Sequence, residues 1–145
     1  MNVEPIPAKR IAAEWHWIRP LLAKAIRHVK QPVSADALLS ETLYRLRIGQ
    51  YELAKVEADK ARGVVVSELC TLDGVDVCWL PFIAGKTGMG PKAFVAFMRA
   101  MMGQFEDMAR AAGAEEIRIG GRDWSRVFPD FERFDDVPNR LRKRL

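Results

Sequence analysis

The sequence contains little cysteine and no long apolar run. Two cysteines in 145 residues fit a reducing compartment and are too few to hold a small fold together with disulfides. The apolar stretches are interrupted by charge or proline, whereas a membrane span needs about 18 consecutive apolar residues. Residues Met1–Pro5 lack the basic and apolar regions of a signal peptide. We therefore expect neither a membrane span nor a secreted protein.

Histidine and tyrosine are equally rare, with two of each, and this limits the available chemistry. His16 and His28 lie twelve positions apart, so they do not form the close pair of a helical metal site. A nucleophile at Cys70 or Cys78 would need a histidine partner, and neither histidine is close to them in sequence. We expect no metal centre.

The charge of the chain is concentrated at one end. Length and composition, with 49% hydrophobic and 29% charged residues, fit a single domain over residues 1–145. Residues 140–144 hold four of the 23 basic residues and no acid, which leaves 19 residues of each sign elsewhere. This short basic end (residues 140–145) lacks the interleaved aromatic side chains of a single-strand binding surface. We therefore do not expect nucleic-acid contact.

Hydrophobic periodicity predicts the order of the elements. It indicates two early helices, at 8–29 with Pro20 expected to kink or divide it, and at 35–48 between a Ser34 cap and Gly49. The remaining predictions are strands at 2–6, 51–58, 63–72, about 75–83 and 116–120, a loop at 85–90, a helix at 91–112, a short helical segment at 124–128 and a final strand. The order β-α-α-β-β-β-α-β-α-β predicts a mixed α/β (α+β) domain with a central sheet flanked by helices.

Asp73-Gly74 predicts the register of one hairpin. The dipeptide supplies the positive φ angles of a type I′ turn. With these two residues at the turn, Cys70 faces Val77, Leu69 faces Cys78, and Glu68 faces Trp79. Successive side chains alternate between the faces of a sheet, so the two cysteines should point to opposite sides and form no disulfide.

The loop Gly85-Lys86-Thr87-Gly88-Met89-Gly90, together with the element order, resembles the GNAT acyltransferase superfamily over nearly the whole chain. In that family the loop carries Arg or Gln, then Gly three positions later, then Gly or Ala two further on. Gly88 and Gly90 match, whereas Gly85 stands where Arg or Gln belongs. The resemblance implies that Lys86, Thr87, Gly88, Met89 and Gly90 bind the pyrophosphate of CoA or acetyl-CoA with loop amides and a helix N-terminus. A Walker A loop is excluded because Leu80 occupies its first glycine position.

The same resemblance implies a carboxylate base and a tyrosine acid. Glu68 is the well-placed carboxylate of the predicted hairpin and would deprotonate an amine. No tyrosine lies in the late segment Asp123–Phe128, since the only tyrosines are Tyr44 and Tyr51. This departure from the family's pattern favours lost activity.

The segment Ile117–Phe128 is similar to small GNAT-like proteins encoded among the structural and packaging genes of tailed phages and prophages. In the purely structural interpretation, Trp124 and Phe128 are core residues and the nearby arginines are solvated. The alternative interpretation makes the basic residues a docking surface for acidic virion proteins or for phosphate: Arg122, Arg126, Arg140, Arg142, Lys143 and Arg144. The protein would then be found in the virion or the host cytoplasm, bound to other virion or assembly proteins or to its own copies.

Two functions therefore stay open. The first is a non-catalytic GNAT-like virion-associated or assembly component that needs no cofactor, because a fold does not fix a function. The alternative is an N-acyltransferase that uses acetyl-CoA and an amine acceptor, with Glu68 as the base.

Overall fold

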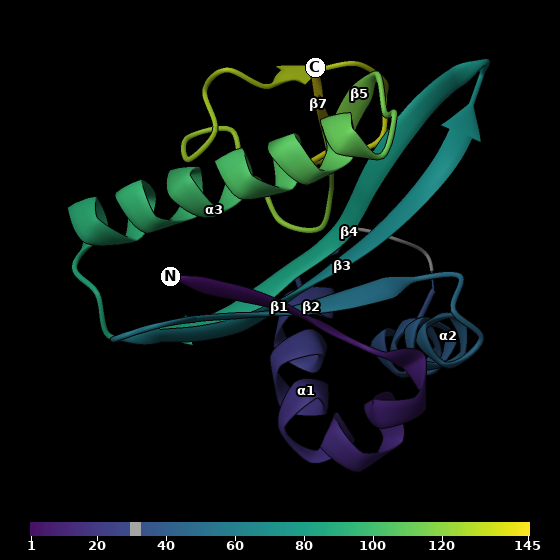
Figure 1. The fold of residues 1–145 in the computed structure, drawn as a ribbon, viewed down its shortest axis with the longest axis vertical. Helices are drawn as coiled ribbons and strands as arrows, with labels where there is room; N and C mark the ends of the chain where they lie inside the picture. The colour runs from purple at the N-terminus through teal and green to yellow at the C-terminus, as the bar shows by residue number, and fades with distance from the viewer. Residues whose placement is uncertain (30–32) are drawn as a thin grey trace.

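The computed structural model describes residues 1–29 and 33–145, in which seven strands form one sheet (Figure 1). The strand order is β1-β2-β3-β4-β5-β7-β6, antiparallel throughout except for the parallel pair β4 and β5. The elements are β1 (Asn2–Ile6), η1 (Ala8–Arg10), α1 (Ile11–Ile26), α2 (Ala35–Arg47), β2 (Glu52–Ala58), β3 (Ala61–Leu72), β4 (Val75–Thr87), α3 (Pro91–Ala111), β5 (Glu116–Ile119), β6 (Glu132–Arg133) and β7 (Leu141–Arg144). The predicted mixed α/β sheet flanked by helices is confirmed.

The sheet separates two apolar cores, because alternate side chains of each strand point to opposite faces. On one face, α1 and α2 cover Leu53, Val64, Val66 and Phe82. On the other face, the methionine-rich side of α3 covers Val65, Leu80, Ile117 and Ile119. Burying each such side chain contributes about 1.5–3 kcal/mol, so the helices are held mainly by these apolar contacts.

The early helices follow the sequence with one exception. The Ser34 hydroxyl accepts a hydrogen bond from the Ala37 amide at 3.1 Å and caps α2, as predicted. Pro20 was expected to kink or divide the helix, and the division is wrong, since α1 continues through Pro20. Ile18 and Leu22 on either side of the proline are fully buried, and this packing maintains the helix past the missing backbone hydrogen bond.

The β3–β4 hairpin has the predicted register. Asp73 and Gly74 have φ angles of 51° and 78°, and Glu68 faces Trp79. Cys70 and Cys78 are both free, and they lie opposite Val77 and Leu69 as expected.

A bulge and a parting of strands interrupt the middle of the sheet. The register shifts between Val66 and Glu68, so Leu80 and Pro81 of β4 together face the single residue Ser67. Parallel pairing with β5 stops at Leu80, where the Gly120 amide donates to the Leu80 carbonyl at 3.1 Å. From Pro81 to Thr87, β4 pairs only with β3 among the described residues, which leaves its other edge open.

Two predicted boundaries differ from the structure. β4 extends to Thr87 because it stays paired with β3 as far as Ala61, so the loop before α3 contains only residues 88–90. The late helix predicted at 124–128 is a single turn, with Val127 and Phe128 amides donating to the Trp124 carbonyl, and Pro129 stops its extension. The predicted final strand is β7, and β6 pairs beside it.

The structure contains no helix, within the described residues, that is long and apolar enough to cross a bilayer.

Two glycines are required where β3 and β4 approach each other most closely. Gly63 and Gly85 are cross-strand partners, and a Cβ on Gly63 would lie 2.5 Å from the Ala84 carbonyl oxygen. A Cβ on Gly85 would lie 2.9 Å from the Arg62 carbonyl oxygen. In contrast, a Cβ on Gly88 or Gly90 would meet nothing within 4 Å. The fold therefore demands the first pair of glycines and not the second.

We predict that Gly63→Ala lowers the free energy of unfolding by about 1–3 kcal/mol, because the new methyl group must displace backbone atoms. Gly88→Ala, whose methyl group would meet no atom within 4 Å, should change the free energy of unfolding by less than about 0.5 kcal/mol. Urea unfolding of the two variants measures the difference. Equal stability would contradict the assigned close approach.

Candidate functional site

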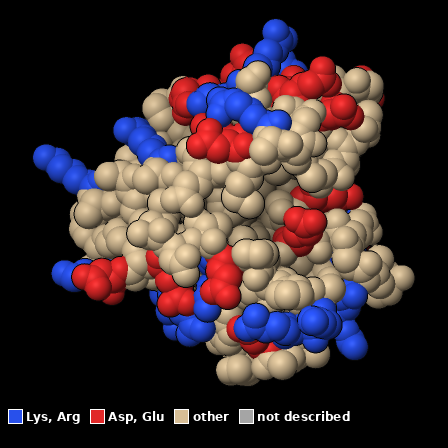
Figure 2. All heavy atoms as spheres, viewed as in Figure 1, with Lys and Arg blue, Asp and Glu red and all other residues tan. Residues whose placement is uncertain are grey.

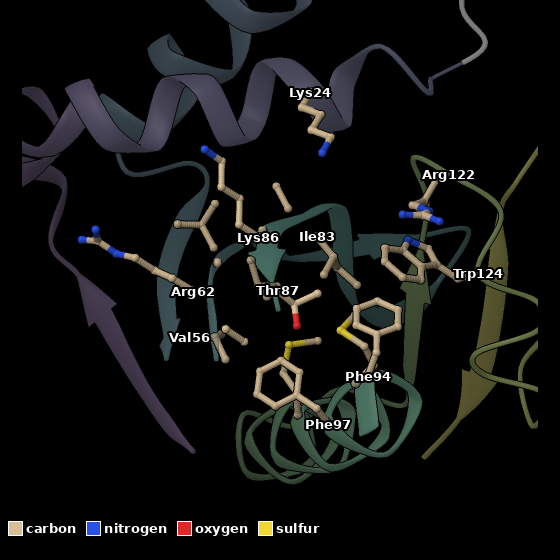
Figure 3. Close-up of a pocket in the computed structure, with 18 residues that line it drawn as sticks. Lys24, Val56, Arg62, Ile83, Lys86, Thr87, Phe94, Phe97, Arg122 and Trp124 are labelled. Carbon is tan, nitrogen blue, oxygen red and sulfur yellow. The ribbon is translucent and has the colours of Figure 1, made fainter. Parts of the chain in front are cut away.

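The open edge of β4 borders a cavity of about 490 Å³, which we call the edge cleft (Figure 3). Lys24 of α1 lies on one side of it, Phe94 and Phe97 of α3 lie on the opposite side, and Arg122 and Trp124 close one end. The cleft exists because β5 leaves β4 at Leu80 while α1 and α3 remain on the two faces of the sheet.

The edge cleft is lined by four cations and no acid. The cations come from four separate parts of the chain and are Lys24, Arg62, Lys86 and Arg122. Within the described residues, none of the four has a carboxylate within 4.0 Å. Arg62 lies over the Trp17 ring at 4.1 Å, and Arg122 over the Trp124 ring at 4.8 Å. Arg62 faces Glu57 across the strands, and the pKa of Glu57 is lowered by Lys55 and in a smaller part by Arg62. The excess of positive charge in the lining attracts an anionic ligand.

The remaining wall of the edge cleft is apolar. It consists mainly of Val56, Val65, Ile83, Phe94, Phe97, Met98 and Met101. An apolar trough with cations near its ends suits an elongated molecule that has an uncharged body and anionic groups.

In the loop predicted to bind pyrophosphate, two backbone amides already donate hydrogen bonds within the protein. The Gly88 amide donates to the Lys60 carbonyl at 2.8 Å, and the Met89 amide donates to the Thr87 hydroxyl at 3.0 Å. Lys86 and Thr87 belong to β4 and line the edge cleft, whereas Gly88, Met89 and Gly90 do not line it. Gly88 instead borders a shallower surface depression together with Lys60.

Free amides lie just beyond this loop, at the start of α3. Its first helical hydrogen bond runs from Phe94 to the Gly90 carbonyl at 2.9 Å, and Pro91 at the first position has no amide hydrogen. The amides of Lys92 and Ala93 therefore have no acceptor within the helix. No side chain caps this end, so the helix dipole is open to an anion there.

Glu68 lies outside the edge cleft. It lines a second cavity of about 680 Å³, the hairpin cleft, on the sheet face that carries α1 and α2. Val65 is the last residue of β3 that lines the edge cleft, and the three residue steps from Val65 to Glu68 span about 10 Å.

The two clefts flank the point where β4 and β5 part. Trp79 and Arg118, paired just before the parting, line the hairpin cleft. Ile83 and Arg122, just beyond it, line the edge cleft. The ring of Trp79 fills the space beside Gly120, where an added Cβ would lie 2.6 Å from a ring carbon.

The basic residues predicted to bind partners fall into two groups. Arg122 and Arg126 belong to the segment 120–128 after β5, which we call the late turn. Arg122 lines the edge cleft and Arg126 is exposed. The second group lies at and next to β7. There Arg140 pairs with Asp135 at 3.6 Å, and Arg142 pairs with Glu132 at 3.1 Å. In the space-filling view, acidic and basic side chains alternate over the region of β6 and β7 (Figure 2). Most of this basic end is therefore neutralised within the protein.

Lys143 joins β7 to α3. Its ammonium nitrogen lies 2.7 Å from Oε1 of the buried Glu106 and 2.6 Å from Oδ2 of Asp130. The hydrogen bond from Lys143 lowers the pKa of Asp130, and the bonds to both carboxylates raise the pKa of Lys143. This arrangement indicates a structural role for Lys143.

The structure brings together residues that the sequence could not associate. Lys24 and Arg62 were missed because they lie on a helix and a strand far from the loop that matched the family pattern. Tyr51 was considered only as a residue distant from the late segment, yet it lines the hairpin cleft together with Glu68.

Comparisons with known proteins match the fold and nothing finer. No protein-family model matches the sequence, and no curated protein does. Among the solved structures that match is one described as a probable acetyltransferase, with 16% identity, a TM-score of 0.57, and coverage of 83% of this chain and 79% of that one. Another is described as the AtaT-AtaR complex bound to DNA, with 10% identity, a TM-score of 0.61, and coverage of 99% and 94%. These likenesses, with the sheet topology, show a fold of the GNAT acetyltransferase type.

We predict that both thiols react slowly with iodoacetamide in the native protein. Burial raises the pKa of Cys78 to about 11, and burial followed by the nearby Glu68 raises the pKa of Cys70. The thiolate is the reactive form, so little of it exists at pH 7.5. Mass spectrometry should show fast labelling only after unfolding in urea. Fast native labelling of Cys78 would contradict its protonated, buried state.

We predict that Lys143→Ala lowers the free energy of unfolding by about 1–2 kcal/mol, because it leaves the buried Glu106 without its cation. Arg144→Ala, which removes an exposed cation with no ion-pair partner among the described residues, is the matched control and should be near neutral. The lowered pKa of Asp130 stabilises the fold above the usual aspartate pKa of 3.8, and this contribution is lost as the pH falls through the folded-state value. The difference in the free energy of unfolding between wild type and Lys143→Ala should therefore become smaller as the pH is lowered. Equal losses of stability in Lys143→Ala and Arg144→Ala would contradict a structural role for Lys143.

Proposed function

We propose that the protein is an acyl-CoA-dependent N-acyltransferase and that the edge cleft takes the CoA portion of the donor. The observation that carries the proposal is the set of four cations in this cleft that lack carboxylate partners. CoA carries several phosphate charges on an elongated and partly apolar molecule, and the cleft offers cations along an apolar trough. The GNAT-type fold supports the same function.

The phosphate contacts proposed here differ from those that the family pattern implies. The amides of Gly88 and Met89 are engaged within the protein, so Lys86 and the first-turn amides of α3 take the larger part. Gly88 and Gly90 still leave room for close approach, since no protein atom lies near their absent side chains. Arg62 and Arg122, each stacked on a tryptophan, are positioned to contact further anionic groups.

Acyl transfer to an amine requires a proton acceptor and a proton donor. A C–N bond forms and the C–S bond of the thioester breaks, while the amine nitrogen loses a proton and the departing thiolate gains one. Glu68 is proposed to receive the proton from the amine, directly or through water. Burial raises the pKa of Tyr51, so this phenol stays protonated at neutral pH in the same cleft. It supplies a donor that the late segment lacks.

The hypothesis of a non-catalytic virion component rests on the segment Ile117–Phe128 alone. Neither structural relative reported above is described as a virion protein. The complex of AtaT with AtaR suggests that a protein partner for this chain is worth testing as well.

We predict that calorimetric titration detects micromolar binding of acetyl-CoA and that Arg122→Ala weakens it by about three- to tenfold. Arg126→Ala is the matched control, because it removes an exposed arginine of the same turn that does not line the edge cleft. Binding should also weaken as salt rises, as expected for charge attraction. Gly88→Asp, which places a negative side chain at the loop, should reduce binding further.

Absence of acetyl-CoA and CoA binding by folded wild-type protein would overturn the proposal. Equal weakening by Arg122→Ala and Arg126→Ala would remove the edge cleft from the binding site. Unfolding curves of each variant establish that the loss does not come from misfolding.

A further inference from the structure

The hairpin cleft differs from the edge cleft in how its charges are balanced. Its lining contains four arginines and four carboxylates: Arg45, Arg118, Arg140, Arg142, Glu68, Asp73, Glu116 and Asp135. The edge cleft has cations alone. The hairpin cleft, unlike the edge cleft, is therefore not suited to binding a ligand with several negative charges.

Every arginine of the hairpin cleft already has a carboxylate. Arg45 donates to Glu41 at 2.6 Å and 3.1 Å. Arg118 donates to the buried Glu116 at 3.0 Å, and the other two pair with Asp135 and Glu132. Each guanidinium also lies within 6 Å of the centre of an aromatic ring, the rings being Tyr51, Trp79 and Phe134. The arginines and rings thus form fixed walls with no free positive charge.

Glu68 has no ion-pair partner in these walls; the pKa of Arg45 is raised chiefly by its hydrogen bond to Glu41 and only in a smaller part by Glu68. Its closest polar partner among the described residues is the Gln50 amide, at 3.3 Å, and no cation lies within 4.0 Å of it. The other unpaired carboxylate, Asp73, is exposed at the tip of the hairpin. The carboxylate inside the cleft that has no ion-pair partner and is not at the hairpin tip is therefore Glu68, which faces Trp79 across the strands. Leu72 and Val75 add apolar surface to the cleft further along the hairpin.

We propose that the hairpin cleft is the acceptor site of the transferase proposed above, and that Glu68 selects acceptors that carry an ammonium group on an apolar stem. The cleft volume of about 680 Å³ accommodates a stem as well as the ammonium group. Anionic acceptors are disfavoured because no arginine is free to pair with them. The stem can belong to a free alkylamine or to a lysine side chain, since both present the same chemistry.

The test is a titration of the full chain with n-pentylamine at pH 7 in the absence of any acyl donor. Nitrogen-15 spectra follow the indole N–H of Trp79, identified with Trp79→Phe. Because no CoA is present, the result does not depend on whether the edge cleft binds CoA. We expect n-pentylamine to shift this signal, and 1-pentanol and pentanoate to bind more weakly.

Two variants test the role of Glu68. Glu68→Gln should weaken n-pentylamine binding by about fivefold, as expected for loss of a solvent-accessible ion pair. Glu52→Gln is the matched control: it makes the same change on the neighbouring strand β2, on the opposite sheet face, and should leave the affinity unchanged. Equal binding of 1-pentanol and n-pentylamine, or equal losses in the two variants, would overturn the proposal.

A further ligand distinguishes a lysine side chain from a free alkylamine as the acceptor. Tighter binding of Nα-acetyl-lysine amide than of n-pentylamine would assign the site to a lysine side chain, and the reverse would assign it to a free amine. If the protein transfers acyl groups, Glu68→Gln should raise the KM for the amine. A lowered kcat with unchanged KM and unchanged amine affinity would refute selection by Glu68.

Discussion

The parting of β4 from β5 is the constraint on which the rest of the molecule depends. A parallel strand pair normally continues while both strands have amides and carbonyls to exchange. Here the bulge at Leu80 and Pro81 shifts the register, and Pro81 has no amide hydrogen to donate. β5 ends at Ile119, and the glycines that follow it turn the chain away. An open strand edge results, bordered by a helix on each face of the sheet. The edge cleft forms along this open edge, and the hairpin cleft lies on the other side of the parting, where β4 and β5 are still paired.

The edge cleft and the hairpin cleft differ in charge because carboxylates line only the hairpin cleft. β5 and β7 bring Glu116 and the paired arginines to one face of the sheet, and the loop before β7 adds Asp135. The lining of the edge cleft receives cations from α1, β3, β4 and the late turn without any acid. One cleft is thereby left positive and the other negative at Glu68. This separation suits the acyl transfer proposed above, because the positive cleft would attract the anionic donor and the negative charge of Glu68 would attract the cationic acceptor.

The sequence predicts what local chemistry determines. The hairpin register follows from Asp73-Gly74 as far as the pair of Glu68 and Trp79, because a two-residue turn fixes the pairs next to it until a bulge intervenes. The Ser34 cap depends on one neighbouring amide. The extent of β4 was not predictable, since Thr87 is strand only because the distant Ala61 pairs with it. The edge cleft was missed for the same reason: Lys24, Arg62 and Arg122 become neighbours only through the folded sheet. Tyr51 and Glu68 likewise come together only across strands.

The glycines of the predicted loop fall into two structural kinds that motif matching alone does not separate. Gly85 is required by the backbone of β3, whose carbonyl at Arg62 leaves no space for a side chain. Gly88 and Gly90 are surrounded by open space, and their angles do not require glycine, so the folded chain gives no reason for their lack of a side chain. A sequence pattern treats all three alike. The structure separates the glycine that the fold needs, Gly85, from the two that leave open space, Gly88 and Gly90.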